Sequence, residues 1–175
     1  MKRIIKNKKG FTLIETIIYV GIIGLILSGF ISFSVVIADS RNKNYVTQEV
    51  QANFRSAFDL ITKKIKEADS INVGASTFNS DPGVLSLAMD DAGENPTIIN
   101  LSQDDGVLQI KEGSSEPVAI VSDEIRVTNL VFTNLSTASP RENVRIELTL
   151  EFNNQASDVE FNYSESFQTA VSLRH

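Results

Sequence analysis

The feature that most constrains this chain is an uncharged, apolar run of 23 residues from Thr16 to Ala38. About 20 such residues suffice to cross the hydrocarbon core of a bilayer as a helix. The ten residues at the start of the chain carry five Lys or Arg and no acid, whereas Asp39, Arg41 and Lys43 after the run net only +1. The positive-inside rule therefore predicts a single-pass protein of the cytoplasmic (inner) membrane, with its N-terminus inside and its C-terminal domain outside.

An ordinary secretory signal is one alternative for this segment. Such a signal has a shorter apolar core, followed by a small-residue cleavage site. Here the apolar run is too long, and its far end, residues 36–40, is a poor site of that kind. A simple uncleaved signal anchor remains the other alternative.

Charge and cysteine content exclude several classes of function. The chain has a net charge of −6 and the first ten residues contribute +5, so residues 11–175 carry −11. An acidic domain argues against nucleic acid as a partner, because phosphate contacts need a basic face. There is no cysteine, so disulfides, thiolate metal sites and cysteine nucleophiles are excluded.

A short motif joins the basic leader to the apolar run: Gly10-Phe11-Thr12-Leu13-Ile14-Glu15. It resembles the prepilin processing site of the type IV pilin-like family, and the resemblance in sequence covers roughly residues 8–40. The resemblance implies that a prepilin peptidase/methyltransferase cuts between Gly10 and Phe11 and then N-methylates Phe11. On this interpretation residues 1–10 are a cleaved leader peptide, and residues 11–38 are a transmembrane and polymerisation helix.

Glu15 is the residue whose position most needs an explanation. An ionised side chain at a bilayer centre costs about 2.5–3.5 kcal/mol on insertion scales, and less near the surface. Cleavage after Gly10 would give it a partner, since the new amine on Phe11 is cationic and four residues away on one helix face. Glu15 can pair with its own amine or with that of a neighbouring subunit; the family resemblance implies the second, an assembly salt bridge. A helix N-terminal Glu favoured by the dipole is the plainer alternative.

Small residues within the run form a second candidate feature. Gly21, Gly24, Ser28 and Ser32 follow one another at steps of three, four and four, so they share a face on which other helices can approach closely. We predict that this face packs against helices of other subunits. The alternative is that Gly and Ser are simply common in membrane helices.

An amphipathic pattern continues beyond the run. Apolar residues recur at steps of three or four, as a helix stripe requires: Val46, Val50, Phe54, Phe58, Ile61, Ile65 and Ala68. No proline or glycine interrupts residues 30–73. We predict one helix over residues 12–68, whose second half, within residues 39–69, packs on a domain.

The remainder, residues 70–175, reads as an extracytoplasmic β-rich globular domain. Turn signals such as Asp81-Pro82-Gly83 separate short β-rich segments, and residues 144–152 alternate strictly between apolar and polar. Predicted strands are Val84–Met89, Thr97–Leu101, Val107–Lys111, Val118–Val121, Ile125–Asn134, Val144–Phe152 and Phe167–Leu173. The predicted fold class is α+β and pilin-like: one long N-terminal helix packed on an antiparallel sheet.

No catalytic, cofactor or metal site is predicted. His175, the one histidine, is the last residue and a poor place for a general base. Calcium is conceivable at five turn aspartates, but glycines lie next to them and EF-hand spacing is absent, so ordinary turn residues are favoured: Asp81, Asp90, Asp91, Asp104 and Asp105. Three Asn-x-Ser matches, at Asn100, Asn134 and Asn162, are near the number that chance gives.

The resemblance implies a structural subunit rather than an enzyme. We expect a minor pilin or pseudopilin that enters or primes a type IV pilus, competence pilus or type II secretion pseudopilus, with other pilins as partners. The absence of a cysteine pair and of a mid-helix proline favours a minor subunit over a major pilin. Segments 125–132 and 167–174 are also similar to minor pseudopilins of the J type. The alternatives are a major pilin, or a membrane-anchored binding or adhesin domain that does not polymerise.

Overall fold

The computed structural model describes residues 10–103, 106–136, 142–154 and 162–174. The chain divides into two compact units, Met1–Arg41 and Asn42–His175, and helix α1 contributes to both. The elements in chain order are α1 (Leu13–Glu67), β1 (Ser70–Ile71), the 3-10 turn η1 (Val73–Ala75), β2 (Leu85–Ala88), β3 (Thr97–Leu101), β4 (Leu108–Glu112), β5 (Val118–Ala119), β6 (Ile125–Asn134), β7 (Asn143–Phe152) and β8 (Ser164–Ser172).

The predicted helix is confirmed to within one residue at each end. In the first unit, residues 13–41 of α1 expose almost all their side chains. In the second unit the helix buries a stripe at steps of three and four, as the amphipathic pattern predicts: Val46, Val50, Phe54, Ala57, Ile61, Lys64 and Ile65. The apolar periodicity did not predict two members of this stripe, Ala57 and Lys64, and Phe58, which it did predict, is half-buried.

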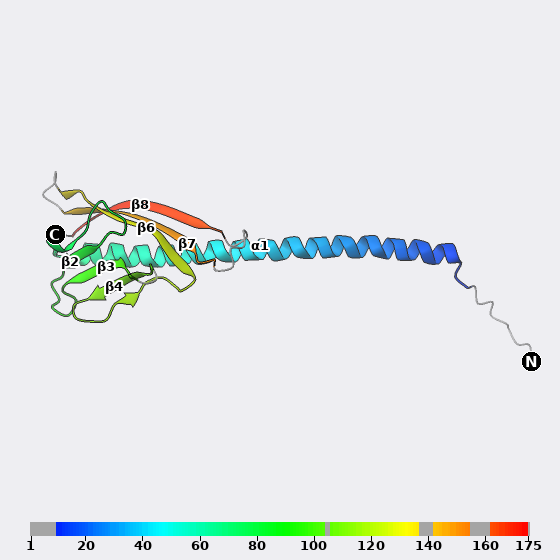
Figure 1. Ribbon diagram of the computed structural model, residues 1–175, viewed down its shortest axis with the longest axis horizontal. Coiled ribbons are helices and arrows are strands. Elements are labelled where there is room, and N and C mark those ends of the chain that lie inside the picture. Colours follow the sequence, from blue (N-terminus) through cyan, green and yellow to red (C-terminus); the bar gives the residue numbers. More distant parts are fainter. Residues whose placement is uncertain (1–9, 104–105, 137–141, 155–161, 175) are drawn as a thin grey trace, which may run out of the picture. The chain divides into compact units, whose positions relative to one another are not determined.

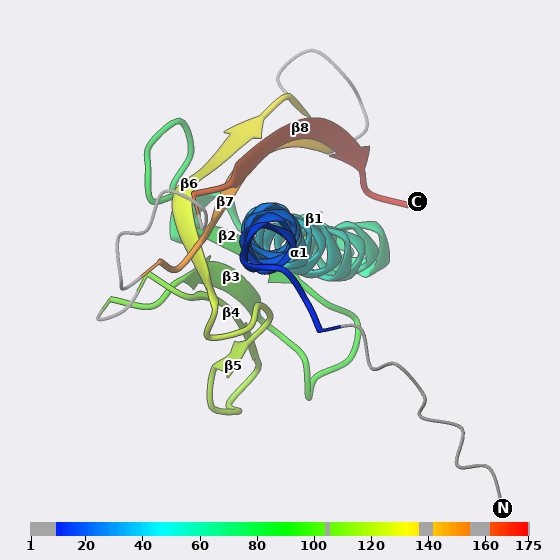
Figure 2. The ribbon, with the colours of Figure 1, turned by 90° about the vertical axis from the view of Figure 1, so that its right-hand side faces the viewer.

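Among its described residues, the second unit contains two antiparallel sheets, whereas the sequence predicted one. One sheet has the order β1-β2-β3-β4-β5, and the other has the order β6-β7-β8. Figures 1 and 2 show the two sheets lying along different sides of α1. Their inward-facing side chains and the helix stripe form one core, with Leu85, Ile99, Leu130, Phe132 and Ile146 fully buried.

The division into two sheets follows from contacts with the helix between β5 and β6. The predicted strand over residues 118–121 ends at Ala119. Ser122 then donates its backbone N–H to Asn53 Oδ1 of α1 at 2.7 Å, and its hydroxyl lies 3.3 Å from Glu49 Oε1. Asn53 thus accepts the backbone N–H that a continuing strand would use, and the chain leaves the first sheet here.

The 72–84 segment supports the outer edge of the second sheet. Asn79 donates its backbone N–H to the Phe132 carbonyl at 2.8 Å, and Gly83 donates to the Leu130 carbonyl at 2.7 Å. The Leu130 N–H in turn donates to Asp81 Oδ1 at 2.9 Å. Gly83 fits closely here, because an added Cβ would stand 3.0 Å from the Phe132 ring and 3.1 Å from the Leu130 carbonyl oxygen.

Candidate functional site

The junction between Gly10 and Phe11 lies in exposed, non-helical chain directly ahead of α1. Helix α1 begins at Leu13, and Phe11 is 76% exposed. Among the described residues, no atom beyond the chain neighbours lies within 4 Å of a Cβ built on Gly10. The Phe11 ring meets the Tyr19 ring edge-on, with centroids 6.1 Å apart. Exposed chain with few contacts is the form in which peptidases cleave a substrate, so a peptidase can reach this bond.

Thr12 and Glu15 cap the start of the helix reciprocally. Glu15 donates its backbone N–H to Thr12 Oγ1 at 3.3 Å, and Thr12 donates its backbone N–H to Glu15 Oε2 at 3.4 Å. The first helical bond follows, from Thr16 N–H to the Thr12 carbonyl at 3.2 Å. This is a capping box, the Thr-x-x-Glu pattern in which each side chain satisfies a backbone donor that the helix leaves free.

The capping box gives Glu15 a local role beyond the favourable interaction of an acid with the helix dipole, because its carboxylate also accepts a backbone hydrogen bond. Its carboxylate reaches back to the N–H of Thr12, the residue next to Phe11. A cationic amine created at Phe11 would therefore appear one residue from a group that already binds this carboxylate. Thr12 is the residue of the motif whose function was missed, although Thr-x-x-Glu before an apolar run is readable from sequence.

The four small residues of the predicted packing face leave open space beside the helix, and the serine hydroxyls among them hydrogen-bond within the helix. Among the described residues, no atom outside the local helix backbone lies within 4 Å of a Cβ built on Gly21 or Gly24. Ser28 Oγ donates to the Leu25 carbonyl at 2.9 Å, and Ser32 Oγ donates to the Ser28 carbonyl at 3.0 Å. Packing of other helices against this face stays a prediction.

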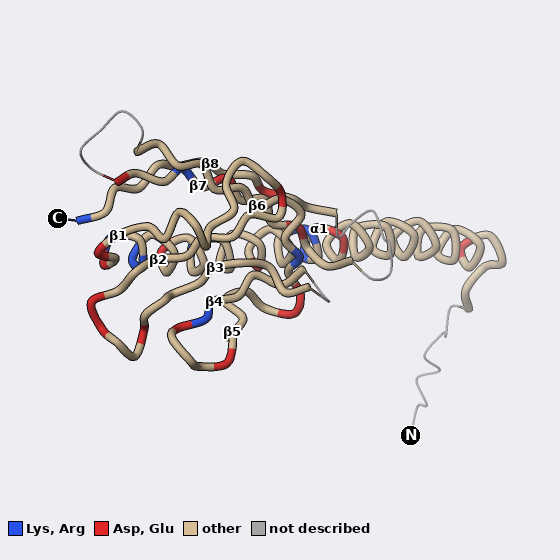
Figure 3. Tube along the Cα trace, turned by 60° about the vertical axis from the view of Figure 1, so that its left-hand side comes forward, with Lys and Arg blue, Asp and Glu red and all other residues tan. Residues whose placement is uncertain are grey.

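The first part of α1 has the composition of a membrane span. Within the described residues, α1 is the one helix that is long and apolar enough to cross a membrane, and its most apolar window has a mean hydropathy of 2.5. Figure 3 shows this part of the tube in tan except for one acidic segment close to its start; from Gly10 to Ala38 the sequence has one charged residue, Glu15. The helix fits a membrane anchor that carries a single acid near its end.

A cluster of three charged side chains links the C-terminal end of α1 to the domain. Lys64 Nζ lies 2.7 Å from Glu94 Oε2 and 2.6 Å from Glu112 Oε1, and its side chain is 9% exposed. Burial lowers the pKa of the Lys64 ammonium, but the hydrogen bonds and charges of Glu112 and Glu94 outweigh burial and raise the pKa above its ordinary value. The three groups together form a structural anchor between α1 and the five-stranded sheet.

The turn aspartates act as turn residues where the structure describes them. Asp91 Oδ1 accepts the Gly93 N–H at 2.8 Å, and Asp81 Oδ1 accepts a backbone N–H of β6. Asp90 is exposed, whereas Asp104, Asp105 and the terminal His175 lie outside the described residues. The described part of the chain contains no group of three or more His, Cys, Asp or Glu side chains placed to hold a metal ion.

Comparison with protein families adds an independent finding. Residues 5–31 match the family described as the prokaryotic N-terminal methylation motif. The match spans Gly10, Phe11 and Glu15 and extends into the apolar part of α1, past the predicted packing residues Gly21, Gly24 and Ser28. Neither the curated proteins nor the solved structures gave a match to this chain.

Proposed function

We propose that this chain, which carries the methylation motif at the start of a long apolar helix and a β-sheet domain behind it, is a type IV pilin-like prepilin that serves as a minor pilin or pseudopilin. In this role a prepilin peptidase removes residues 1–10 and methylates Phe11. The mature subunit is then held in the cytoplasmic membrane by residues 11–38, with its domain outside. It joins or primes a filament of other pilins in a type IV pilus, a competence pilus or a type II secretion system.

One observation carries the proposal: the methylation motif at residues 5–31 coincides with an exposed Gly10–Phe11 bond immediately before a capped helix. Peptidase access, a new amine at Phe11 and an acid held beside that position by Thr12 are the three conditions that processing and pairing need. Pairing of Glu15 with the amine of a neighbouring subunit would set the axial step between subunits, since the two charges are adjacent only in one register.

Two features of the chain favour a minor over a major subunit. It has no cysteine pair, and α1 contains no proline, whereas many major pilins have a proline in the middle of the apolar segment. The J-type similarity of segments 125–132 and 167–174 supports the same choice. Copy number tests it: in sheared filaments of the native host we expect this chain to be rare relative to the other pilins. Abundance equal to the principal subunit would contradict the minor role.

Processing is tested by mass spectrometry of the mature N-terminus from a host with a prepilin peptidase. The expected first residue is N-methyl-Phe11. A mature chain that starts at any other residue contradicts the processing step. A chain that starts at unmethylated Phe11 contradicts only the methylation.

The role of Glu15 is tested by two matched substitutions. Glu15→Gln keeps an oxygen for the Thr12 N–H but removes the charge, so we expect a stable, processed protein that fails to enter filaments. Thr12→Val removes the side-chain acceptor of the capping box but keeps the carboxylate, so we expect incorporation to persist. The measurement is the amount of each variant in sheared filaments relative to its amount in membranes. Normal incorporation of Glu15→Gln would refute the assembly salt bridge and favour an anchored binding or adhesin domain that does not polymerise.

A further inference from the structure

The two outer edges of the β6–β8 sheet differ in how they are protected. On the β6 side, residues 79–83 cover the edge through the hydrogen bonds to Leu130 and Phe132 described above. On the β8 side, in the part of the chain that the structure describes, β8 pairs with β7 alone. Its outward N–H and C=O groups therefore form an open row of donors and acceptors.

β8 lacks the devices that usually protect such an edge. It pairs with β7 over nine residue pairs without a register shift, and it contains no proline, no lysine and a single charged residue, Glu165. Proteins normally interrupt exposed edges with charges, prolines or bulges, because a long regular edge pairs with other strands. Water satisfies these groups in the free protein, and an extended chain is the form of protein partner that can pair with the whole row, so the open edge favours a partner in strand form.

An apolar side chain marks the same edge. Phe167 of β8 is 48% exposed although it packs on α1: its ring centroid lies 5.3 Å from that of Phe54 and 5.5 Å from that of Phe58. A strand added beside β8 would cover the exposed part of this ring. The partner therefore needs apolar side chains on its inward face.

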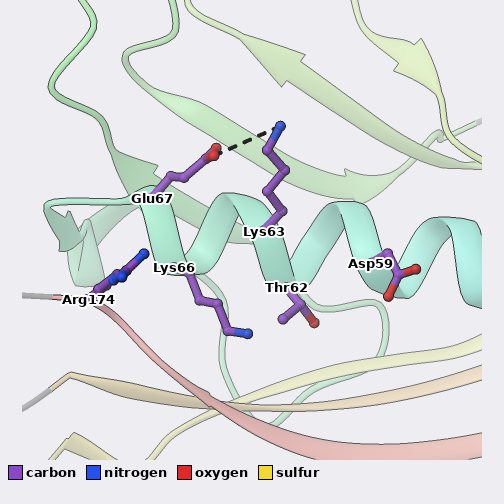
Figure 4. Close-up of a pocket in the computed structure, with 6 residues that line it drawn as sticks. All are labelled: Asp59, Thr62, Lys63, Lys66, Glu67 and Arg174. Atoms are coloured by element: carbon purple, nitrogen blue, oxygen red, sulfur yellow. Dashed lines mark ion pairs between the residues drawn. The ribbon is translucent and has the colours of Figure 1, made fainter.

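The contacts of β8 also fix its direction. Phe167 lies next to Phe54 and Phe58, and Arg174, just after β8, lies next to Lys66 and Glu67 in a groove of about 370 Å³. β8 therefore runs in the same direction as residues 54–67 of α1. In Figure 4, Asp59, Thr62 and Lys66 point from the helix toward the side of β8, while Lys63 and Glu67, joined by a dashed line, point to the other side.

The end of this groove is suited to an acidic group. Lys63 pairs with Glu67 at 3.9 Å. For Lys66 and Arg174, no carboxylate lies within ion-pair distance among the described residues. Asp59 also lines this groove, but among the described residues it forms no ion pair with either cation. Lys66 and Arg174 are therefore available to a carboxylate ligand.

We propose that the β8 edge and this groove bind an extended segment of a different protein subunit. The segment adds a fourth strand to the β6–β8 sheet, antiparallel to β8. Its inward apolar side chains cover Phe167, and an acidic side chain near its N-terminal end meets Lys66 and Arg174.

A second copy of this chain does not fit the site as well. Antiparallel pairing of β8 with its own copy would run the two α1 segments in opposite directions, because β8 runs along α1. Two subunits anchored in one membrane have their helices in the same direction, so the antiparallel strand proposed here favours a different subunit as the partner. The inference does not depend on how Glu15 acts, and the test below does not involve filaments.

The test uses the full-length chain in detergent micelles and a labelled synthetic peptide, acetyl-Thr-Glu-Thr-Val-Thr-Val-Thr-amide, followed by fluorescence anisotropy. The peptide places Glu and both Val side chains on one face. Two further peptides carry backbone N-methyl groups on alternate residues, one for each edge of the strand. We expect the parent peptide to bind, one methylated peptide to bind about tenfold or more weakly, and the other to bind like the parent, since an added strand uses one edge.

Charge is tested in the same assay. Replacing Glu by Gln in the peptide should weaken binding about fivefold, as expected for an exposed ion pair. Lys66→Gln and Arg174→Gln should each reduce this preference for Glu, and Lys63→Gln, the matched control whose cation is already paired, should leave it intact. Absence of binding at millimolar parent peptide, equal binding of both methylated peptides, or equal effects of Lys63→Gln and Lys66→Gln would each overturn the proposal. A concentration-dependent dimer of the free chain that the peptide competes with would instead identify a second copy as the occupant and overturn it too.

Discussion

Lys64 offers a quantitative test of how the five-stranded sheet is fixed to α1. The three charges differ in burial: the Lys64 side chain is 9% exposed, whereas those of Glu94 and Glu112 are 36% and 37% exposed. The free-energy cost of desolvation therefore falls mainly on the ammonium, while water reaches both carboxylates. Removing the cation and removing the anions should therefore have unequal effects on stability.

The magnitudes follow from this asymmetry. Lys64→Met replaces the cation by an apolar chain of similar length and leaves two solvated carboxylates, so we expect a loss of about 1 kcal/mol. The double variant Glu94→Ala/Glu112→Ala leaves the ammonium buried without a counter-charge, which costs about 3–5 kcal/mol in comparable sites. Adding Lys64→Met to the double variant should then restore about 2 kcal/mol or more, because the unpaired buried charge is gone.

The assay is equilibrium unfolding in urea of the full-length chain in detergent micelles, followed by near-ultraviolet circular dichroism of the tyrosines. The four proteins form a thermodynamic cycle, so the comparison does not depend on the absolute stability in detergent. If Lys64→Met costs more than the double alanine variant, or if the triple variant is no more stable than the double, the account of Lys64 as the buried member of the cluster is wrong.

Two further predictions concern the same domain. Gly113 has φ +53° and an added Cβ would collide with the Gly93 carbonyl oxygen, so Gly113→Ala should lower the free energy of unfolding by about 1–3 kcal/mol; urea titration checks this, and an unchanged midpoint would contradict it. The hydrogen bond to Glu124, with smaller effects of burial and charge, raises the pKa of Tyr45, and the pKa of Lys64 is raised as well. Both groups hold their protons more tightly when folded, so their contributions are complete below about pH 10 and are lost as pH rises through the folded-state pKa values. Unfolding at about pH 8 and about pH 11 should show this fall, and Tyr45→Phe should make it smaller.

The parts of the fold that local pattern determines were predicted closely. The strands Thr97–Leu101 and Ile125–Asn134 begin and end where the sequence placed them, because turn residues bound a short apolar segment in each case. The helix ends one residue before the predicted boundary, at Glu67, since its stripe runs unbroken to the change of composition at Asp69. Periodicity and turn chemistry suffice where one element is defined by its own residues.

What the sequence did not predict depends on contacts between distant residues. Strand β1 has two residues, Ser70–Ile71, too few for any alternation to be visible. β8 begins at Ser164, three residues before the predicted start, because pairing with β7 and not apolar content sets its length. The division into two sheets rests on Asn53 of the helix binding Ser122, 69 positions away in the chain. No local pattern reports such a pair.

The candidate site divides in the same way. Gly10, Phe11 and Glu15 were predicted because the motif is contiguous, and its family match covers them. The Thr12 cap was also within reach, since the pattern spans four residues. Lys66 and Arg174 lie more than a hundred positions apart, and their shared groove exists only once β8 has paired with β7.

The hydrogen bonding of the first unit bears on the proposed transfer from membrane to filament. Ser28, Ser32, Ser34 and Ser40 each donate a hydroxyl to a carbonyl of the same helix, three or four residues back. Because these polar groups are satisfied within the helix, moving the segment from lipid to a bundle of helices would break none of their bonds, and the transfer carries no penalty for unpaired hydroxyls. Glu15 is different, since its second carboxylate oxygen has no bond among the described residues. The one charge in the segment would therefore gain most from a cationic amine, so Glu15 is the place where the free energy of the two environments should differ most.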